Sequence, residues 1–379
     1  KALQPRLCLI VSPLFSVFHV LGRTRSRRGM AFKCKRWSCA NILPVAFVVW
    51  VILAIWSVYT FLHLAPMLMS EQGSDVFKRG VWQAGLVQSL TLLLIICFTR
   101  AVFTDPGAVP EGPEWRGRDA QNKLRMQPGS DTGLQITEPG SVAVSTRESK
   151  QSGGRRFCKW CDKFKPDRCH HCRVCRSCIL RMDHHCPWIA NCVGFRNHKY
   201  FFLLVLYSLA TCISVVVTMA ESISKAVTEE STTTFRFFLV FGMTLAITMT
   251  LLLSMFFPLH LWLMAKATTT IEFCEKQYRS TGPGAQISYD RGPYENVKAV
   301  LGPHFLLWLL PISPPAGSGL YFECSGRTPL VGAPKFKEPS SDSSTAPSVG
   351  GLANRKRDDR LPLIDGQAPE VTGAQASAA

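Results

Sequence analysis

The apolar residues of this 379-residue chain fall into four blocks, and each block is long enough to cross a lipid bilayer. A membrane-spanning helix needs about 20 consecutive, mainly apolar residues, because it rises about 1.5 Å per residue through a hydrocarbon core about 30 Å thick. The blocks lie at residues 42–64, 81–103, 200–220 and 237–263. We therefore predict an all-α polytopic membrane protein with four transmembrane helices.

Basic residues are unevenly distributed between the segments that join these blocks. The stretch before the first block and residues 104–199 are rich in Lys and Arg, whereas the loops near 65–80 and 221–236 carry few, offset by acidic residues. Short basic segments stay on the cytosolic side of a membrane. We therefore expect both termini and residues 104–199 to be cytosolic. The membrane is expected to be an endomembrane, at the Golgi or endoplasmic reticulum, or the plasma membrane.

The segments outside the apolar blocks differ in composition. Residues 1–29 hold a short apolar run followed by arginines, and we interpret them as an upstream extension ahead of Met30. A stretch rich in Gly and Pro predicts a flexible linker, and a stretch of Ser, Gly, Pro and charge predicts disorder. The predicted segments are a cytosolic N-terminal segment 1–41, a linker 104–155, a cysteine-rich domain 156–206, a cytosolic element 265–312 and a disordered tail 313–379.

The formal net charge of +17 indicates an anionic partner. Nucleic acid, anionic lipid head groups or a phosphorylated cofactor would each supply one. The four apolar blocks and the absence of the C-x2-4-C-x12-H-x3-5-H finger spacing argue against a nucleic-acid-binding protein. A transporter would need ionisable groups inside its spans, and these blocks have almost none.

Eight of the 15 cysteines crowd between Cys158 and Cys192. Several stand at C-x2-C spacing, which places two thiolates on one tight turn and suits a tetrahedral zinc ion. In a secreted protein such density would indicate disulfides, but on a cytosolic face it indicates metal. A zinc-stabilised fold without chemistry would explain this spacing as well as a catalytic domain would.

The number of possible metal ligands favours a catalytic domain over a purely structural zinc fold. Two closed zinc sites need about eight ligands, and the cluster offers eight cysteines together with His170, His171, His184 and His185. About four of these twelve possible ligands are therefore not needed for metal. A cysteine beside a histidine and an aspartate suits nucleophilic catalysis, because the imidazole promotes the thiolate and the carboxylate orients the imidazole. Asp183, His184 and Cys186 are close enough in sequence to form this relay.

Three short motifs flank the cysteine cluster: Asp105-Pro106-Gly107, Thr269-Thr270-Ile271-Glu272, and Tyr289-Asp290 through Asn296 to Gly302. The cluster itself runs through Cys158, Cys161, His171, Cys172, Cys175, Cys178, Asp183, His184, His185, Cys186, Cys192, Asn197 and Phe201. These residues resemble the signature of the DHHC protein S-acyltransferases, also called palmitoyltransferases, and the three motifs are similar to those of the same family and occur in the expected order.

The resemblance implies a role for most of these residues. It implies that Cys186 carries an acyl group, that His184 is the base and that Asp183 orients it. It further implies that Thr270 braces Asp183 and that Asn296 satisfies backbone groups at the helix ends. Two structural zinc ions are implied within short β-hairpins, one held by Cys158, Cys161, His171 and Cys178, and the other by Cys172, Cys175, His185 and Cys192.

The implied reaction passes a long-chain acyl group from acyl-CoA, such as palmitoyl-CoA, through Cys186 to juxtamembrane cysteines of substrate proteins. Arg155 and Arg156 are candidates for binding the CoA phosphates, with anionic lipid head groups as the alternative. Thr211 is a candidate for the far end of the acyl cavity.

A rival interpretation is a non-catalytic, zinc-scaffolded membrane adaptor. Candidates for acylation of the chain itself, against ordinary unmodified cysteines, are Cys34, Cys39 and Cys274.

Overall fold

The computed structural model describes residues 39–116, 146–148, 155–228, 230–278, 287–312, 315 and 317–324. The predictions for residues 1–29 and Cys34, and most of the predicted linker and tail, lie outside these residues. The side chain of Cys39 lies outside them as well.

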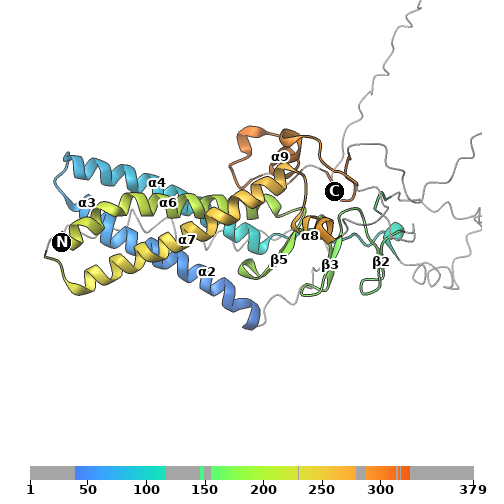
Figure 1. Ribbon diagram of the computed structural model, residues 1–379, viewed down its shortest axis with the longest axis horizontal. Coiled ribbons are helices and arrows are strands. Elements are labelled where there is room, and N and C mark those ends of the chain that lie inside the picture. The colour runs from blue at the N-terminus through green and yellow to red at the C-terminus, as the bar shows by residue number, and fades with distance from the viewer. Residues whose placement is uncertain are drawn as a thin grey trace, which may run out of the picture. The chain divides into compact units, whose positions relative to one another are not determined.

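Four helices in the described part of the chain are long and apolar enough to cross a membrane, as predicted (Figure 1). The first candidate span, Ile42–Met69, combines α2 (Cys39–Val58), a π-helical turn η1 (Tyr59–Leu64) and α3 (Ala65–Met69). Each span is longer than its apolar block, because capped polar turns extend the helix. Ser74 and Thr232, for example, cap α4 and α7 by accepting hydrogen bonds from Phe77 N and Phe235 N. The other three spans are α4 (Asp75–Phe103), α6 (His198–Thr228) and α7 (Thr233–Ala265).

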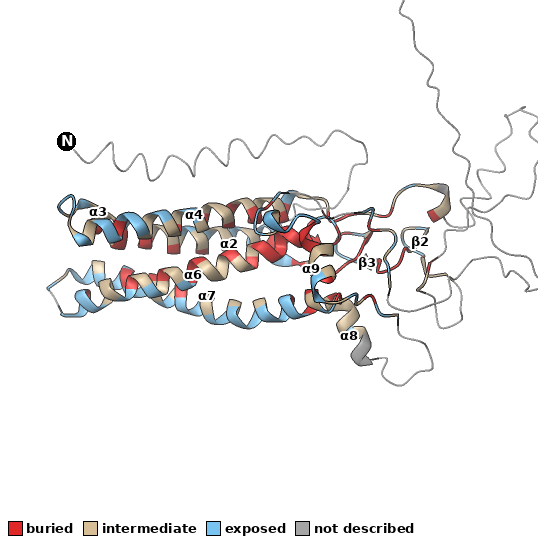
Figure 2. Cartoon of the chain, turned by 90° about the horizontal axis from the view of Figure 1, so that it is seen from above, coloured by how far each residue is buried: buried red, intermediate tan, exposed pale blue. Residues whose placement is uncertain are grey.

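Helix α6 packs against both α4 and α7, and most of α7 is exposed (Figure 2). Many of the exposed residues of α7 are large and apolar, with Met255 at 81% exposure, which suits a surface facing lipid. Gly242 lets α7 approach α2 closely, because a Cβ atom at this position would lie 2.5 Å from Val58 Cγ1.

A buried polar network joins three of the spans through the π-helical turn. His63 Nδ1 lies 2.7 Å from Ser222 Oγ of α6, and His63 Nε2 lies 2.9 Å from Gln83 Oε1 of α4. Tyr59 Oη lies 2.8 Å from Thr218 Oγ1. Because polar groups in hydrocarbon must find partners within the protein, this network fixes the relative rotation of the helices.

Among the described residues between α4 and α6, the chain forms three two-stranded antiparallel hairpins. The two apolar clusters that hold the first two hairpins are small, and six of their twelve buried residues are cysteines, so these hairpins need cross-links that a hydrophobic core of this size cannot supply. The hairpins pair β1 (Phe157–Cys158) with β2 (Lys163–Phe164), β3 (His170–Cys172) with β4 (Ser177–Ile179), and β5 (His184–Cys186) with β6 (Asn191–Val193). A 3₁₀ turn η3 (Pro187–Ile189) joins β5 to β6.

The chain after α7 forms α8 (Thr270–Tyr278), α9 (Pro293–Leu301) and the 3₁₀ turn η4 (Phe305–Leu307). Helix α9 packs on α6 and α7.

Two segments assigned to linker or tail from composition are packed in the structure. Trp115, in the 3₁₀ turn η2 (Pro113–Trp115), is fully buried against the first hairpin's cluster. In residues 317–324, Phe322 lies 6.2 Å from Phe195 and 6.1 Å from Tyr289 between ring centroids. Single aromatic residues thus anchor stretches whose average composition is polar, which the compositional prediction missed.

Candidate active site

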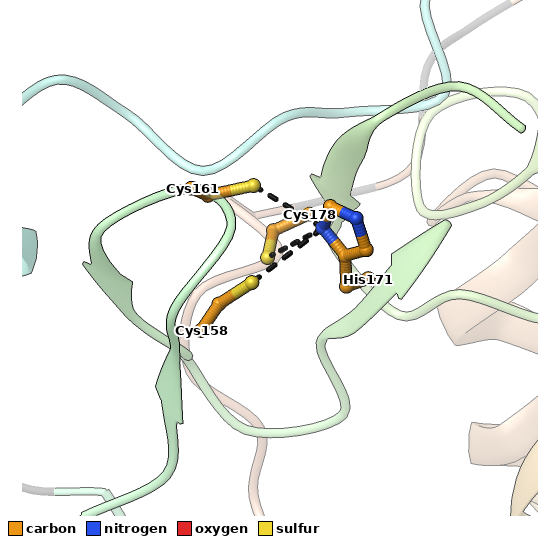
Figure 3. Close-up of side chains that lie close together, drawn as sticks. All are labelled: Cys158, Cys161, His171 and Cys178. Carbon is orange, nitrogen blue, oxygen red and sulfur yellow. Dashed lines mark hydrogen bonds between the residues drawn. The ribbon is translucent and has the colours of Figure 1, made fainter. Parts of the chain in front are cut away.

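The first hairpin and the β3–β4 hairpin bring together Cys158, Cys161, His171 and Cys178 (Figure 3). His171 Nδ1 lies 3.5, 3.2 and 3.9 Å from the sulfurs of Cys158, Cys161 and Cys178. A tetrahedral zinc ion would separate a nitrogen and a sulfur ligand by about 3.6 Å. These four residues therefore fit a closed zinc site.

A second set consists of Cys172, Cys175, His185 and Cys192. His185 Nδ1 lies 3.7, 3.5 and 3.5 Å from the sulfurs of Cys172, Cys175 and Cys192. The second set links the β3–β4 hairpin to the β5–β6 hairpin, so two metal ions would tie all three hairpins into one unit.

The side chains of strand β5 divide between a metal-ligand set on one face and a histidine–cysteine pair on the other. Successive side chains of a strand point to opposite faces, so His184 and Cys186 share one face while His185 points to the other. On that other face His185 pairs in register with Cys192, a member of the same ligand set. The sequence His-His-Cys thus supplies one metal ligand and, on the opposite face, a histidine and a cysteine.

Asp183 holds the imidazole of His184 in one orientation. His184 Nδ1 donates to Asp183 Oδ2 at 2.7 Å, which leaves Nε2 directed away from the carboxylate. Asp183 also accepts two hydrogen bonds from Thr270, one from the backbone N–H at 2.9 Å and one from the hydroxyl at 2.8 Å. The buried carboxylate is therefore well satisfied, and the position of the imidazole is fixed.

These contacts shift the pKa values of the pair in opposite directions. Burial raises the pKa of Asp183, but the hydrogen bond from His184 and nearby positive charge outweigh it, so the pKa lies well below its ordinary value. Burial lowers the pKa of His184, but Asp183 and Cys186 raise it to about 9. His184 is therefore an imidazolium at neutral pH, and an imidazolium beside a cysteine sulfur stabilises the thiolate.

The segment Thr269-Thr270-Ile271-Glu272 is a capping box at the start of α8. Glu272 N donates to Thr269 Oγ1 at 3.2 Å, and Thr269 N donates to Glu272 Oε2 at 2.9 Å. Glu272 also accepts a bidentate pair from the buried Arg168 at 2.6 and 2.7 Å. The motif thus anchors α8 to the cysteine-rich region and presents Thr270 to Asp183.

Two asparagines attach the third hairpin to the end of α4. Asn191 Nδ2 donates to the carbonyl oxygens of Ala101, Val102 and Thr104, at 3.1, 3.2 and 2.9 Å. Asn197 Nδ2 donates to Cys192 O at 2.8 Å, while its Oδ1 accepts from Gly194 N at 2.9 Å. The last carbonyl groups of a helix have no donor within the helix, and these bonds to the end of α4 hold Cys186 at the end of the helix bundle.

Comparison with known proteins agrees with this geometry. Residues 151–277 match the family described as DHHC palmitoyltransferase. "Probable protein S-acyltransferase 16" of Arabidopsis thaliana is 36% identical over 299 residues, which cover 76% of this chain and 94% of that protein. "Palmitoyltransferase ZDHHC2" of Danio rerio is 35% identical over 346 residues, covering 91% and 92%. "Palmitoyltransferase ZDHHC20" of Homo sapiens is 31% identical over 301 residues, covering 78% and 80%.

This chain belongs to the DHHC palmitoyltransferase family. The predicted family membership is therefore confirmed, as is the fold of four membrane helices with a Cys/His cluster between the second and third.

Other predicted site residues of this DHHC protein have defined neighbours. Asn296 Nδ2 donates to the carbonyl of Ala265, the last residue of α7, at 2.8 Å. Thr211 is buried in α6, where its hydroxyl donates to Tyr207 O at 2.7 Å. Cys274 is exposed on α8. The proposed roles of Thr211 in an acyl cavity and of Cys274 in acylation stay predictions.

The two arginines predicted to bind CoA make structural contacts. Arg156 forms a 2.5 Å ion pair with Glu148 and donates to the carbonyls of Pro166 and Cys169, each at 3.0 Å. The guanidinium of Arg155 lies 4.4 Å from the ring centroid of Phe164. Within the described part of the chain, no contact links either arginine to Cys186. Their role toward CoA stays a prediction.

Sequence reasoning missed the roles of Arg168, Glu272 and Asn191. Glu272 was noted only as part of a motif, although Thr-x-x-Glu ahead of a helix is a recognisable capping box. The sequence around Asn191 gives no indication of its hydrogen bonds, because the carbonyl groups that accept them lie about 90 residues earlier in the chain.

We expect the purified protein to contain two zinc ions per chain. Because each closed site needs all four ligands, Cys158→Ala and Cys172→Ala should each lose about one ion after a chelator wash and lower the melting temperature. Elemental analysis by mass spectrometry measures the metal content. The control is Cys274→Ala, an exposed cysteine outside both sets, which should retain two ions. A wild-type protein without zinc would contradict the assignment of both sites.

Proposed function

We propose that this DHHC protein transfers a long-chain acyl group from acyl-CoA to cysteine thiols of substrate proteins, and that Cys186 carries the group between them. One observation supports this proposal above the others. Cys186 shares a face of β5 with His184, which Asp183 orients, while the eight residues of the two ligand sets are available to bind metal. Cys186 thus has a catalytic neighbour and no place in either ligand set.

The surroundings of Cys186 suit an acyl chain. Cys186 is 6% exposed and belongs to an apolar cluster with Phe98 and Val102 from the end of α4 and Phe201 from α6. Keeping each CH₂ of the chain out of water contributes about 0.8 kcal/mol. The proposed arrangement has the cysteine-rich domain and both termini in the cytosol. In that arrangement the chain would lie among the helices while CoA stays in water.

In the first half-reaction, the Cys186 thiolate attacks the carbonyl carbon of the acyl-CoA thioester. A new thioester bond forms to Cys186 Sγ, and the bond to the CoA sulfur breaks. The His184 imidazolium, with its pKa of about 9, supplies the proton that the departing CoA thiolate takes up. His184 is then neutral, with Nδ1 still bonded to Asp183.

In the second half-reaction, neutral His184 accepts a proton from the thiol of a substrate cysteine. The substrate thiolate attacks the thioester on Cys186, the acyl group moves to the substrate sulfur, and Cys186 leaves as a thiolate beside the restored imidazolium. Both steps exchange one thioester for another, so the transfer is nearly neutral in free energy. The enzyme contributes orientation and a supply of thiolate.

Two structural zinc ions would hold this arrangement. Each set offers four protein ligands, so a bound zinc ion would have no open position and would supply stability. The proposed partners are acyl-CoA, the lipid bilayer, and proteins with cysteines close to the membrane surface. An endomembrane at the Golgi or endoplasmic reticulum is the proposed location, with the plasma membrane as the alternative.

A non-catalytic adaptor of the same fold is the second candidate. It would need the zinc sites and the spans but not an oriented histidine beside a spare cysteine. The 2.7 Å hydrogen bond between His184 and Asp183, and the two bonds from Thr270, favour the enzyme.

The proposal predicts that Cys186→Ser abolishes acyl transfer. The assay supplies an alkyne-labelled palmitoyl-CoA analogue and a cysteine-containing acceptor peptide, and follows CoA release and peptide labelling. Wild type should label the peptide, whereas Cys186→Ser should not, since a serine hydroxyl is a far weaker nucleophile than a thiolate. Both should keep two zinc ions, because Cys186 belongs to neither set. Transfer by Cys186→Ser at the wild-type rate would contradict the proposal.

Thr270 is proposed to position Asp183, and Thr270→Val tests this role. The substitution removes one hydrogen bond to a buried carboxylate, worth about 1.5–3 kcal/mol, so we expect kcat for acylation to fall about tenfold or more. KM for acyl-CoA and the zinc content should not change, and Thr270→Ser should restore the rate.

The matched control for this position is Thr268→Val, because the Thr268 hydroxyl donates to Lys266 O. It should leave kcat unchanged. Equal rates for Thr270→Val and wild type would show that the Thr270 hydroxyl does not position Asp183.

A further inference from the structure

A short segment after α9, residues 305–312, exposes several large apolar side chains beside the spanning helices. Phe305 is 63% exposed, Leu306 77% and Leu309 59%. Leu310 and Ile312 are exposed as well. A contiguous apolar surface of this kind is unusual on a face that meets water, and it marks contact with a membrane or another protein.

Contacts with α6 fix where this segment lies along the helix bundle. Tyr207 Oη donates to the carbonyl of Leu309. Tyr207 is nine residues from the start of α6, or about 13 Å along the helix axis. Figure 1 shows the chain after α9 turning back beside the helices.

The length of α6 relates that position to a bilayer. A helix of 31 residues is about 46 Å long, which exceeds a hydrocarbon core of about 30 Å. If the excess is shared between the two ends, about 8 Å projects at each. The backbone of Tyr207 then lies about 5 Å inside the hydrocarbon. Because helical side chains lean toward the N-terminus of their helix, the Tyr207 hydroxyl and the Leu309 carbonyl bonded to it lie closer to the hydrocarbon boundary.

Several backbone groups of the segment have hydrogen-bond partners within the protein, which lowers the cost of placing a non-helical backbone next to lipid. The buried ammonium of Lys199 donates to Leu307 O at 2.7 Å and to Ile312 O at 2.9 Å. Within the segment, Trp308 N donates to Phe305 O at 3.0 Å and Leu310 N to Leu307 O at 3.2 Å. Lys199 therefore donates hydrogen bonds to carbonyl groups, and lipid acyl chains have no donor that could replace it.

The residues around the segment resemble a membrane interface. The ring of Trp308 lies 5.8 Å from the ring of Tyr294, which is exposed on α9, and Trp308 Nε1 donates to Gly302 O at 2.9 Å. Lys298 Nζ lies 5.7 Å from the centroid of the Tyr294 ring. Aromatic pairs with an adjacent lysine are typical of the head-group level.

We propose that residues 305–312 form a re-entrant segment that enters the acyl-chain region of the leaflet next to the cysteine-rich domain. Lipid covers Phe305, Leu306 and Leu309, and α6 covers the opposite side. Lipid is favoured over a second copy or another protein, because the exposed residues lie at the depth of the spanning helices and continue their apolar surface. The segment anchors α9, and with it Asn296, beside the end of α7.

Photo-crosslinking to lipid tests this proposal in the full-length protein. The photoreactive residue p-benzoylphenylalanine is placed at Leu306 or Leu309, and the protein is reconstituted in phosphatidylcholine vesicles. The positive control carries it at Met255, exposed on α7, and the negative control at Trp160, 65% exposed on the cysteine-rich domain. After irradiation, intact-protein mass spectrometry measures the phospholipid adduct.

We expect adduct yields at positions 306 and 309 within about twofold of the yield at 255, and little adduct at 160. Yields at 306 and 309 no higher than at 160 would overturn the proposal, as would a crosslinked protein dimer in place of the lipid adduct. Acyl transfer measured in the same vesicles reports on Cys186 separately, so failure of either proposal is distinguishable.

Discussion

The alternation of side chains along β5 is the constraint on which the site depends. Only three residues form the strand, yet its pleat directs His185 toward one ligand set and His184 with Cys186 toward the opposite face. A shift of one residue in the pairing of β5 with β6 would place Cys186 among the metal ligands and direct His185 away from them. The register is held by Cys192, which lies opposite His185 in the same set.

The remaining structure places this strand at the end of the helix bundle. Asn191 satisfies three carbonyls at the end of α4, and the capping box of α8 presents Thr270 to Asp183. Asn296 does the same for the end of α7 through Ala265 O. The motifs that surround the cysteine cluster thus have one physical task in common. They supply hydrogen bonds at helix ends, and so hold Cys186 at the end of the helix bundle.

Much of this arrangement could be predicted from sequence, because its determinants are local. Spans follow from apolar length, ligand sets from C-x2-C spacing and the family signature, and the relay from adjacent residues. The missed features depend on distant partners. Arg168 pairs with Glu272 across 104 positions, and Asn191 meets carbonyls of α4 about 90 positions away. Predictions from composition were also wrong for segments in which a single aromatic residue packs against the rest of the protein, as Trp115 and Phe322 do.

The most direct test of the account is to locate the acyl group on the chain. Purified protein is incubated briefly with palmitoyl-CoA and digested, and its cysteine peptides are analysed by mass spectrometry with and without hydroxylamine. The account predicts a hydroxylamine-labile acyl group on Cys186, with the six cysteines of the two ligand sets unmodified. An acyl group on a cysteine of either set, with Cys186 free, would contradict it.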